Sequence, residues 1–267
     1  MSGISFLVFD IETVVDAQAA ARFLSIEQQE TASVRTALRR YQADKTEGRS
    51  DFPKPPFHQV VAISVLCGRI EGPPNDQRIH LQTLTSRSAD TEGEPGLLRW
   101  FFGGFEQLRP QLVSFNGRGF DLPVLKYRAM RNFVSVPLLH DKSNKWENYA
   151  VRYASHWHCD LLEVLSDYGA SPRVTLDEIC TVLGVPGKVG LDGSQVEEMY
   201  DEGRLAEIGA YCETDVLNTY LVYLRWQHHQ GRLTDDGYNA AMAEVRNYVS
   251  NEVATRPHLK AFSSVGA

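Results

Sequence analysis

The sequence predicts an α/β protein in which a strand-rich first half is followed by a helical second half. Apolar, β-favouring runs recur up to residue 115, an apolar pattern with helical spacing separates two of them, and residues from 160 onward carry mainly helical patterns. With 267 residues, 43% of them hydrophobic and 23% charged, the chain is long enough for one large folded domain.

The first strand is expected over residues 4–9, a continuous apolar run typical of a strand that is buried on both faces. Residues 17–48 are polar and compatible with helix. The stretch "RSDFPKPPFHQ" carries three prolines and predicts an extended connector or lid, because proline cannot continue a helix. Two further strands are expected at residues 60–70 and 79–84, separated by the turn-forming stretch "EGPPND".

A helix is expected next, because five apolar residues recur at helical spacing: Leu97, Leu98, Phe101, Phe102 and Phe105. The stretch "QLVSF" predicts a short strand, and Pro123 opens another helix, since proline is tolerated in the first turn. Within a main domain of residues 1–250, residues 14–58 are interpreted as an insertion or loop region. Residues 251–267 are interpreted as a loosely tethered C-terminal tail.

Composition limits the classes of protein to consider. No stretch approaches the ~20 apolar residues of a membrane span, and the N-terminus lacks the basic region of a signal peptide, so we expect a cytoplasmic protein. The cysteines have no short paired spacing, which argues against a zinc site or a disulfide framework (Cys67, Cys159, Cys180 and Cys212). The net charge of −7 argues against a broad basic surface for duplex nucleic acid, but it is compatible with a local groove beside an acidic metal site.

The first candidate site lies in "FLVFDIETVVD", where two acids follow the apolar run. Alternate residues of a strand share a face, so Asp10 and Glu12 point the same way, opposite to Phe9 and Ile11. Two carboxylates ~7 Å apart on one face repel each other, and a divalent cation between them would relieve the repulsion. The alternative is a strand that ends in a solvated acidic loop.

The second candidate is Asp121 in "LVSFNGRGFDLPVL". An apolar strand ends at Phe115, the Asn116–Gly117 dipeptide predicts a turn, and Asp121 therefore lies at the start of a helix. The alternative is that Asp121 serves only as a helix N-cap.

The third candidate is the pair Tyr211 and Asp215 in "EIGAYCETDVLNTYLVYL". These residues are four apart and lie beside an apolar stripe on one helix, so Asp215 is expected to be half buried. The alternative is that Tyr211 is a core residue and that Asp215 pairs with a base or a hydroxyl.

In chain order, Asp10-x-Glu12, Asp121 behind "FNGRGF", and Tyr211-x-x-x-Asp215 resemble the DEDD superfamily of 3′-to-5′ exonucleases, in its tyrosine-bearing subclass (DEDDy). Within it, the chain is most similar to the exonuclease domain of family-B DNA polymerases and to the stand-alone bacterial proteins related to it. The stretches "FPKPPFHQVVAIS", "LDEICTVLGVPGKVGLDGSQV" and "YCETDVLNTYLVYLRW" are similar to that stand-alone group, so the resemblance spans roughly residues 4–227.

The resemblance implies a ribonuclease-H-like fold, with a mixed five-stranded sheet flanked by helices, and two divalent ions ~4 Å apart, Mg²⁺ or Mn²⁺. By the family pattern, Asp10 bridges both ions. Glu12 and Asp215 complete the site that activates water, and Asp121 serves the other ion. Tyr211 orients the nucleophilic water, because a phenol with an unperturbed pKa of ~10 is a poor base at neutral pH.

Substrate contacts are implied at three positions. Asn116 and Phe120 match residues that hold and wedge the terminal nucleotides of a single strand in similar polymerase domains, and a flat ring stacks on any base. Lys188 in "GVPGKVG" is a candidate phosphate contact. Residues 145–158 interleave basic and aromatic side chains, either as a second stacking surface or as packing onto the sheet. Two nearby polar residues match no role (His158 and Asp160).

Two classes of function follow. The first is a metal-dependent 3′-to-5′ exonuclease on single-stranded DNA, with a 3′-to-5′ exoribonuclease on short RNA as the alternative substrate class. The second is a nucleic-acid-binding domain that keeps the fold without the reaction. Because the exonuclease-like unit is expected to use all 267 residues, we do not expect proofreading to be transferred with the resemblance, and trimming of DNA ends in repair is one role that such a unit could have.

Overall fold

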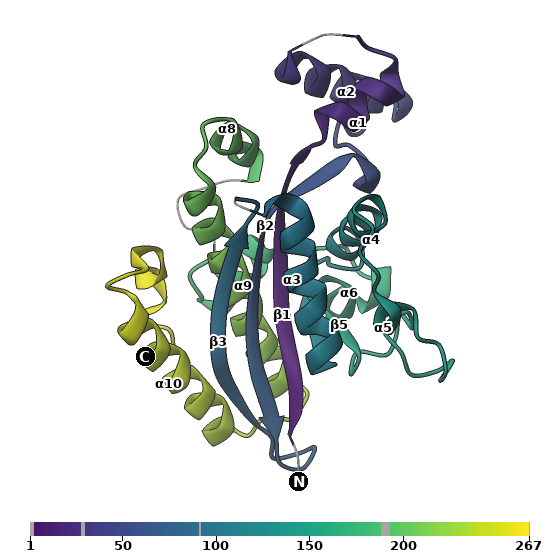
Figure 1. Ribbon diagram of the computed structural model, residues 1–267. Helices are drawn as coiled ribbons and strands as arrows, with labels where there is room; N and C mark the ends of the chain where they lie inside the picture. Colours follow the sequence, from purple (N-terminus) through teal and green to yellow (C-terminus); the bar gives the residue numbers. More distant parts are fainter. Residues whose placement is uncertain (1–2, 28–29, 91, 188–192, 267) are drawn as a thin grey trace.

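The computed structural model describes residues 3–27, 30–90, 92–187 and 193–266 (Figure 1). Across these residues the strands form one mixed five-stranded sheet in the order β3-β2-β1-β4-β5. β2 runs antiparallel to β1 and β3, whereas β4 runs parallel to β1 and β5. The strands are β1 (Ile4–Val15), β2 (His58–Glu71), β3 (Arg78–Ser88), β4 (Gln111–Ser114) and β5 (His158–Asp160). The expected α/β class with a mixed five-stranded sheet is therefore confirmed.

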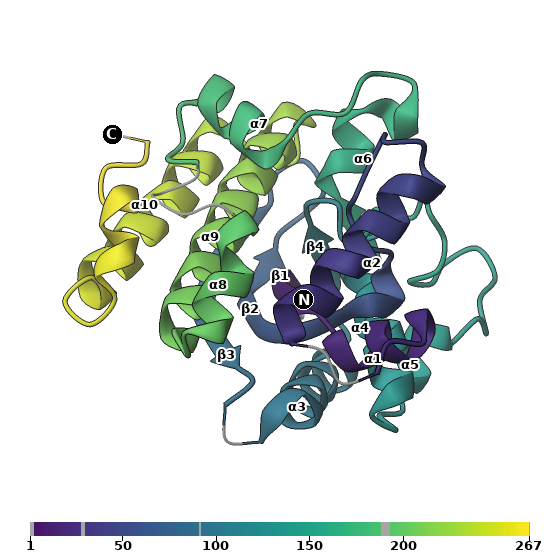
Figure 2. The same ribbon diagram turned by 90° about the horizontal axis from the view of Figure 1, so that it is seen from above.

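Helices cover both faces of this sheet (Figures 1 and 2). None of those within the described ranges is long and apolar enough to cross a membrane. The α-helices are α1 (Ala17–Leu24), α2 (Thr31–Lys45), α3 (Gly93–Leu108), α4 (Asp121–Arg131), α5 (Pro137–His140), α6 (Leu161–Leu165), α7 (Leu176–Leu183), α8 (Val196–Asp201), α9 (Leu205–His229) and α10 (Asp235–Glu252). Short 3₁₀ turns occupy Pro55–Phe57, Asp167–Gly169, Gly193–Gln195 and Pro257–Phe262.

The central strand β1 sends alternate side chains into two separate cores. Phe6 packs with Tyr220 of α9, with ring centroids 5.7 Å apart, in the core that α9 and α10 cover. Phe9 packs with Phe101 of α3, with centroids 5.5 Å apart, in the core beneath α3 and α4. Because Asp10 lies four positions after Phe6, an even offset along the strand, it shares the α9 face of the sheet.

β1 continues beyond the expected end at Phe9. Its pairing with β4 stops at Val8, but its pairing with β2 continues to Val15, with a shift of register after Glu12. The two acids therefore lie inside a strand that has lost one neighbour, and the alternative of a solvated acidic loop is wrong. A register shift of this kind is typical of strands that border an active site.

The α1–α2 hairpin is inserted between β1 and β2 and extends past the end of the sheet (Figure 1). It has a small core of its own, in which Val34 and Leu38 of α2 pack with Val15 and Ala20. The proline-rich stretch that follows is a connector with one 3₁₀ turn at Pro55–Phe57.

Two further features differ from the sequence-based expectations. β5 was missed, because three residues are too few to display a strand pattern. The interpretation of residues 251–267 as a loose tail is wrong for the described residues up to 266: Leu259 and Phe262 are fully buried in the α9–α10 core, and His258 bonds Glu213 at 2.7 Å. Two large apolar side chains three positions apart are too short a pattern to reveal this packing.

Candidate active site

Asp10 and Glu12 of β1 face Cys212 of α9, and together they form the centre of the candidate site. One ligand-type atom from each of these three side chains lies within 4.8 Å of the others. The Cys212 thiol donates weakly to the Asp10 backbone carbonyl, at 3.4 Å, and lies 3.6 Å from the Asp10 Oδ2. Glu12 is buried, with 8% of its surface exposed. Cys212 thus contacts both the backbone and the side chain of an acid of the site.

Asp121 reaches the same place from the first turn of α4. Its Oδ1 accepts a hydrogen bond from the Ile11 backbone N–H at 3.2 Å, across 110 residues of sequence. This donor is available because β4 no longer pairs with β1 at that point. The N-cap of α4 is Phe120, without a side-chain capping bond, so the N-cap explanation for Asp121 is wrong.

Burial raises the pKa of Asp121 to about 7, although the bonds from its own backbone N–H and from that of Ile11 act in the opposite direction. The side chain is 4% exposed. A carboxyl group with this pKa is only partly ionised at neutral pH unless a cation compensates its charge.

Tyr211 and Asp215 lie one turn apart on α9 and share a hydrogen bond. Tyr211 is 5% exposed. Burial raises the pKa of its phenol far above the ordinary value, and the charges of Asp215, Glu12 and Asp10 raise it further. The phenol therefore stays protonated at any physiological pH, and it offers a neutral hydroxyl at the edge of the acidic cluster. Asp215 is half buried, as expected.

Asp10 is the electrostatic centre of the cluster. Burial is the main cause that raises its pKa well above the usual range, and the charges of Asp121, Glu12 and Asp215 raise it further. Four carboxylates that disfavour each other's ionisation match a site for hard divalent cations, which take carboxylate oxygen ligands. The structure thus brings together the four acids and the tyrosine that the sequence singled out, and their donor set fits Mg²⁺ or Mn²⁺.

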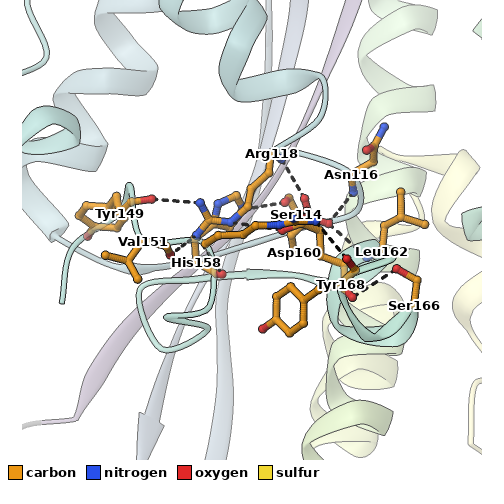
Figure 3. A network of polar contacts seen from close by, with 12 residues as sticks. Ser114, Asn116, Arg118, Tyr149, Val151, His158, Asp160, Leu162, Ser166 and Tyr168 are labelled. Carbon is orange, nitrogen blue, oxygen red and sulfur yellow. Dashed lines mark hydrogen bonds and ion pairs between the residues drawn. The ribbon is translucent and has the colours of Figure 1, made fainter. Parts of the chain in front are cut away.

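The loop that carries Asn116 and Phe120 is held by Asp160, the last residue of β5 (Figure 3). The Asp160 carboxylate accepts from the backbone N–H groups of Asn116 at 2.9 Å, Arg118 at 2.8 Å and Leu162 at 3.1 Å. It is 1% exposed and caps α6. The sequence predicts no role for Asp160, although an acid directly before the apolar helix start "LLEVL" is a signal for a helix N-cap.

The Arg118 side chain fastens the same loop to residues 145–158. Its guanidinium donates to the carbonyls of Tyr149 at 3.2 Å and Val151 at 3.1 Å (Figure 3). Tyr149 is buried against Phe105, whereas Trp146 is 72% exposed. The packing explanation therefore holds for Tyr149, and Trp146 remains on the surface.

Phe120 and Glu12 line one cavity of about 560 Å³ beside the acids, together with Phe52 from the connector before β2 and His58, the first residue of β2. Asn116 has a left-handed backbone with φ of 67°, and its side chain points away from Asp160 (Figure 3). Lys188, the third expected substrate contact, lies outside the described residues.

Comparison with known proteins agrees with this geometry. The family described as "Predicted 3'-5' exonuclease related to the exonuclease domain of PolB" matches residues 50–265. Among solved structures, the family B DNA polymerase from the hyperthermophilic archaeon Pyrobaculum calidifontis superimposes with a TM-score of 0.51 at 17% identity. The superposition covers 98% of this chain and 27% of the polymerase chain. No curated protein sequence matches.

The structural likeness identifies the fold as ribonuclease-H-like. The family match includes Asp121, Tyr211 and Asp215, whereas Asp10 and Glu12 precede it and are placed at the site by the geometry of β1. The chain therefore belongs to the family of predicted 3′-to-5′ exonucleases related to the exonuclease domain of PolB.

Proposed function

We propose that this protein hydrolyses the last phosphodiester bond at the 3′ end of single-stranded DNA, with two divalent metal ions held by Asp10, Glu12, Asp121 and Asp215. The observation that carries the proposal is the convergence of these acids around Asp10. The pKa of Asp10 is raised by burial and by the charges of its three acidic neighbours. A purely structural cluster would gain stability by losing some of these charges.

The acids would divide the work as the resemblance implies. Asp10 would be shared by both ions, Glu12 and Asp215 would hold the ion next to the water, and Asp121 would serve the other. When bound, such a metal pair lowers the pKa of water and stabilises charge on the attacking and leaving oxygens. The water oxygen bonds to phosphorus as the bond to the 3′ oxygen breaks, which yields a nucleoside 5′-monophosphate and a strand with a new 3′-hydroxyl.

Tyr211 would orient the attacking water. Its phenol stays protonated, because burial and three carboxylates raise its pKa, so it does not serve as the base. Its hydrogen bond with Asp215 fixes the hydroxyl beside the ion site. A hydroxyl held in this way contributes by position and not by proton abstraction.

An unpaired strand is favoured as substrate by the surroundings of the acids. The rings of Phe120 and Phe52 line the adjacent cavity, and stacking on a ring requires an unpaired base but no particular sequence. RNA is the alternative, and reading its 2′-hydroxyl would require specific hydrogen bonds near the terminal sugar. A binding domain without activity would have no use for four acids gathered in one place.

The test is degradation of 5′-labelled single-stranded DNA and RNA of the same sequence with Mg²⁺ or Mn²⁺. We expect a DNA ladder that shortens from the 3′ end, no reaction in a chelator, and resistance of a 3′-phosphorylated or circular strand. Asp10→Asn is the inactive variant, and Asp76→Asn, which changes an exposed turn residue, is its matched control. Faster cleavage of RNA would reassign the substrate, and rapid cutting of circles would indicate an endonuclease.

A further inference from the structure

The cavity beside the acids follows β1 toward the α1–α2 hairpin. Its lining residues on this strand begin near Glu12 and end at Val15. Three residues of strand span about 10 Å. One end of the cavity is therefore at Glu12, which brings it next to the other acids of the site, and the other end is where the hairpin leaves the sheet.

At that second end, side chains of α2 meet α8. The Arg39 Nη2 of α2 lies 2.5 Å from the Glu197 Oε2 of α8, and the other Glu197 oxygen accepts from the Val15 backbone N–H at 2.9 Å. Arg39 and Glu197 both line the cavity. The ion pair thus ties two helices to the end of β1 and forms the end wall of the cavity.

A second ion pair supports the first. Arg35, one turn before Arg39 and 4% exposed, binds Asp201 of α8 at 2.7 Å and donates to the Val15 carbonyl at 3.4 Å. Seen from above, α2 and α8 lie on either side of the end of β1 (Figure 2). The two arginines make the junction of α2 with α8 a fixed part of the site.

We infer that the Arg39–Glu197 ion pair closes the cavity behind the 3′-terminal nucleoside, so that the enzyme releases one nucleotide at a time and accepts only a free 3′ end. With the scissile phosphate at the carboxylates, the terminal nucleoside occupies the cavity, and a strand that continued beyond it would meet the ion pair. The inference rests on the proposed function and names what determines its product.

The lining of the cavity suits a nucleoside. The Phe52 ring is 56% exposed and its centroid lies 5.5 Å from that of Phe120 and 5.0 Å from that of His58, so three flat rings border the space. A volume of about 560 Å³ lies within the range of single small-molecule sites. Arg39 and the α1–α2 hairpin precede residue 50, where the family match begins, so the α2 side of this end wall lies outside the matched region and Glu197 lies within it.

The test follows product length. A single-stranded DNA oligomer labelled at its last internucleotide phosphate releases a labelled mononucleotide if the bond next to the terminus is cut, and a labelled di- or trinucleotide if cleavage occurs further in. Wild type should release mononucleotide. Arg39→Ala and Glu197→Gln should raise the share of longer products by about 10-fold or more, as expected when a barrier in a pocket is removed. The same variants should begin to cut circular single strands.

Matched controls are Arg40→Ala and Glu198→Gln, which change the exposed neighbours on the same two helices. Both should release only mononucleotide. Glu197→Gln keeps an oxygen for the Val15 N–H, and thermal unfolding verifies that each variant is folded. Active variants that still release only mononucleotide and leave circles intact would overturn the inference while the proposed function stands. An inactive wild type with either metal would overturn the proposed function, and the inference with it.

Discussion

The metal-free protein should lose stability as the pH rises, because Asp121 is buried where it resists ionisation. Its pKa is about 7 in the folded protein and 3.8 ordinarily. Between these values the folded state binds more protons than the unfolded state, so the free energy of unfolding falls with increasing pH. The stabilising contribution is fully present below about pH 4 and is lost as the pH rises through about 7.

The magnitude follows from the two pKa values. Integrated from pH 5.5 to 8.0, the shift of Asp121 lowers the free energy of unfolding by about 2 kcal/mol. For a protein of this size that corresponds to a decrease in Tm of about 4–8 °C. Asp10, whose pKa is also raised, contributes in the same direction. His58 and His158 act in the opposite direction. Because burial lowers their pKa values, their contribution to the free energy of unfolding rises with increasing pH.

The assay is thermal unfolding in chelator and in Mn²⁺ at both pH values, for wild type and Asp121→Asn. The asparagine keeps an acceptor for the Ile11 N–H but does not titrate, so the difference between the two proteins isolates the carboxylate. We expect wild type to lose about 4–8 °C more than the variant in chelator. Mn²⁺ should remove that difference, since a bound cation favours the ionised carboxylates. An equal pH dependence in both proteins without metal would refute the reasoning.

The remaining predictions concern activity and packing. Asp10→Asn should remove several kcal/mol of transition-state stabilisation and so lower kcat/KM. A purified variant that keeps a tenth of the wild-type rate would contradict the two-metal assignment. Tyr211→Phe should reduce kcat roughly 10- to 1000-fold with KM close to wild type, and an unchanged single-turnover rate at saturating Mn²⁺ would leave Tyr211 a core residue. The Asp160 carboxylate holds the loop of Asn116 through charge-assisted hydrogen bonds. Asp160→Asn should therefore lower the free energy of unfolding by about 2–4 kcal/mol in urea unfolding and raise KM in kinetic assays. Phe262→Ala should lower the free energy of unfolding by about 3–5 kcal/mol, as measured by urea unfolding, because its side chain is fully buried. If residues 251–267 were a loose tail, the urea midpoint would not change.

Local patterns of the sequence determined most of the elements and the identity of the acids. Strand alternation places Asp10 and Glu12 on one face, and helical spacing places Tyr211 beside Asp215, because both periodicities are properties of a single segment. The proline at position 123 and the turn before it place Asp121 at a helix start for the same reason. The structure confirms these features, each of which could be predicted from one segment without knowing which other segments pack against it.

The tertiary structure decided which other segments contact these strand and helix faces. That Ile11 donates to Asp121 depends on β4 ending its pairing at Val8, which no local pattern contains. Likewise, the Arg39–Glu197 pair joins residues 158 apart in sequence, and each alone resembles a solvated charge. Periodicity reports which side of an element is buried, but the partner across the core is selected by packing over the whole chain, and so the closed end of the cavity emerges only in the folded molecule.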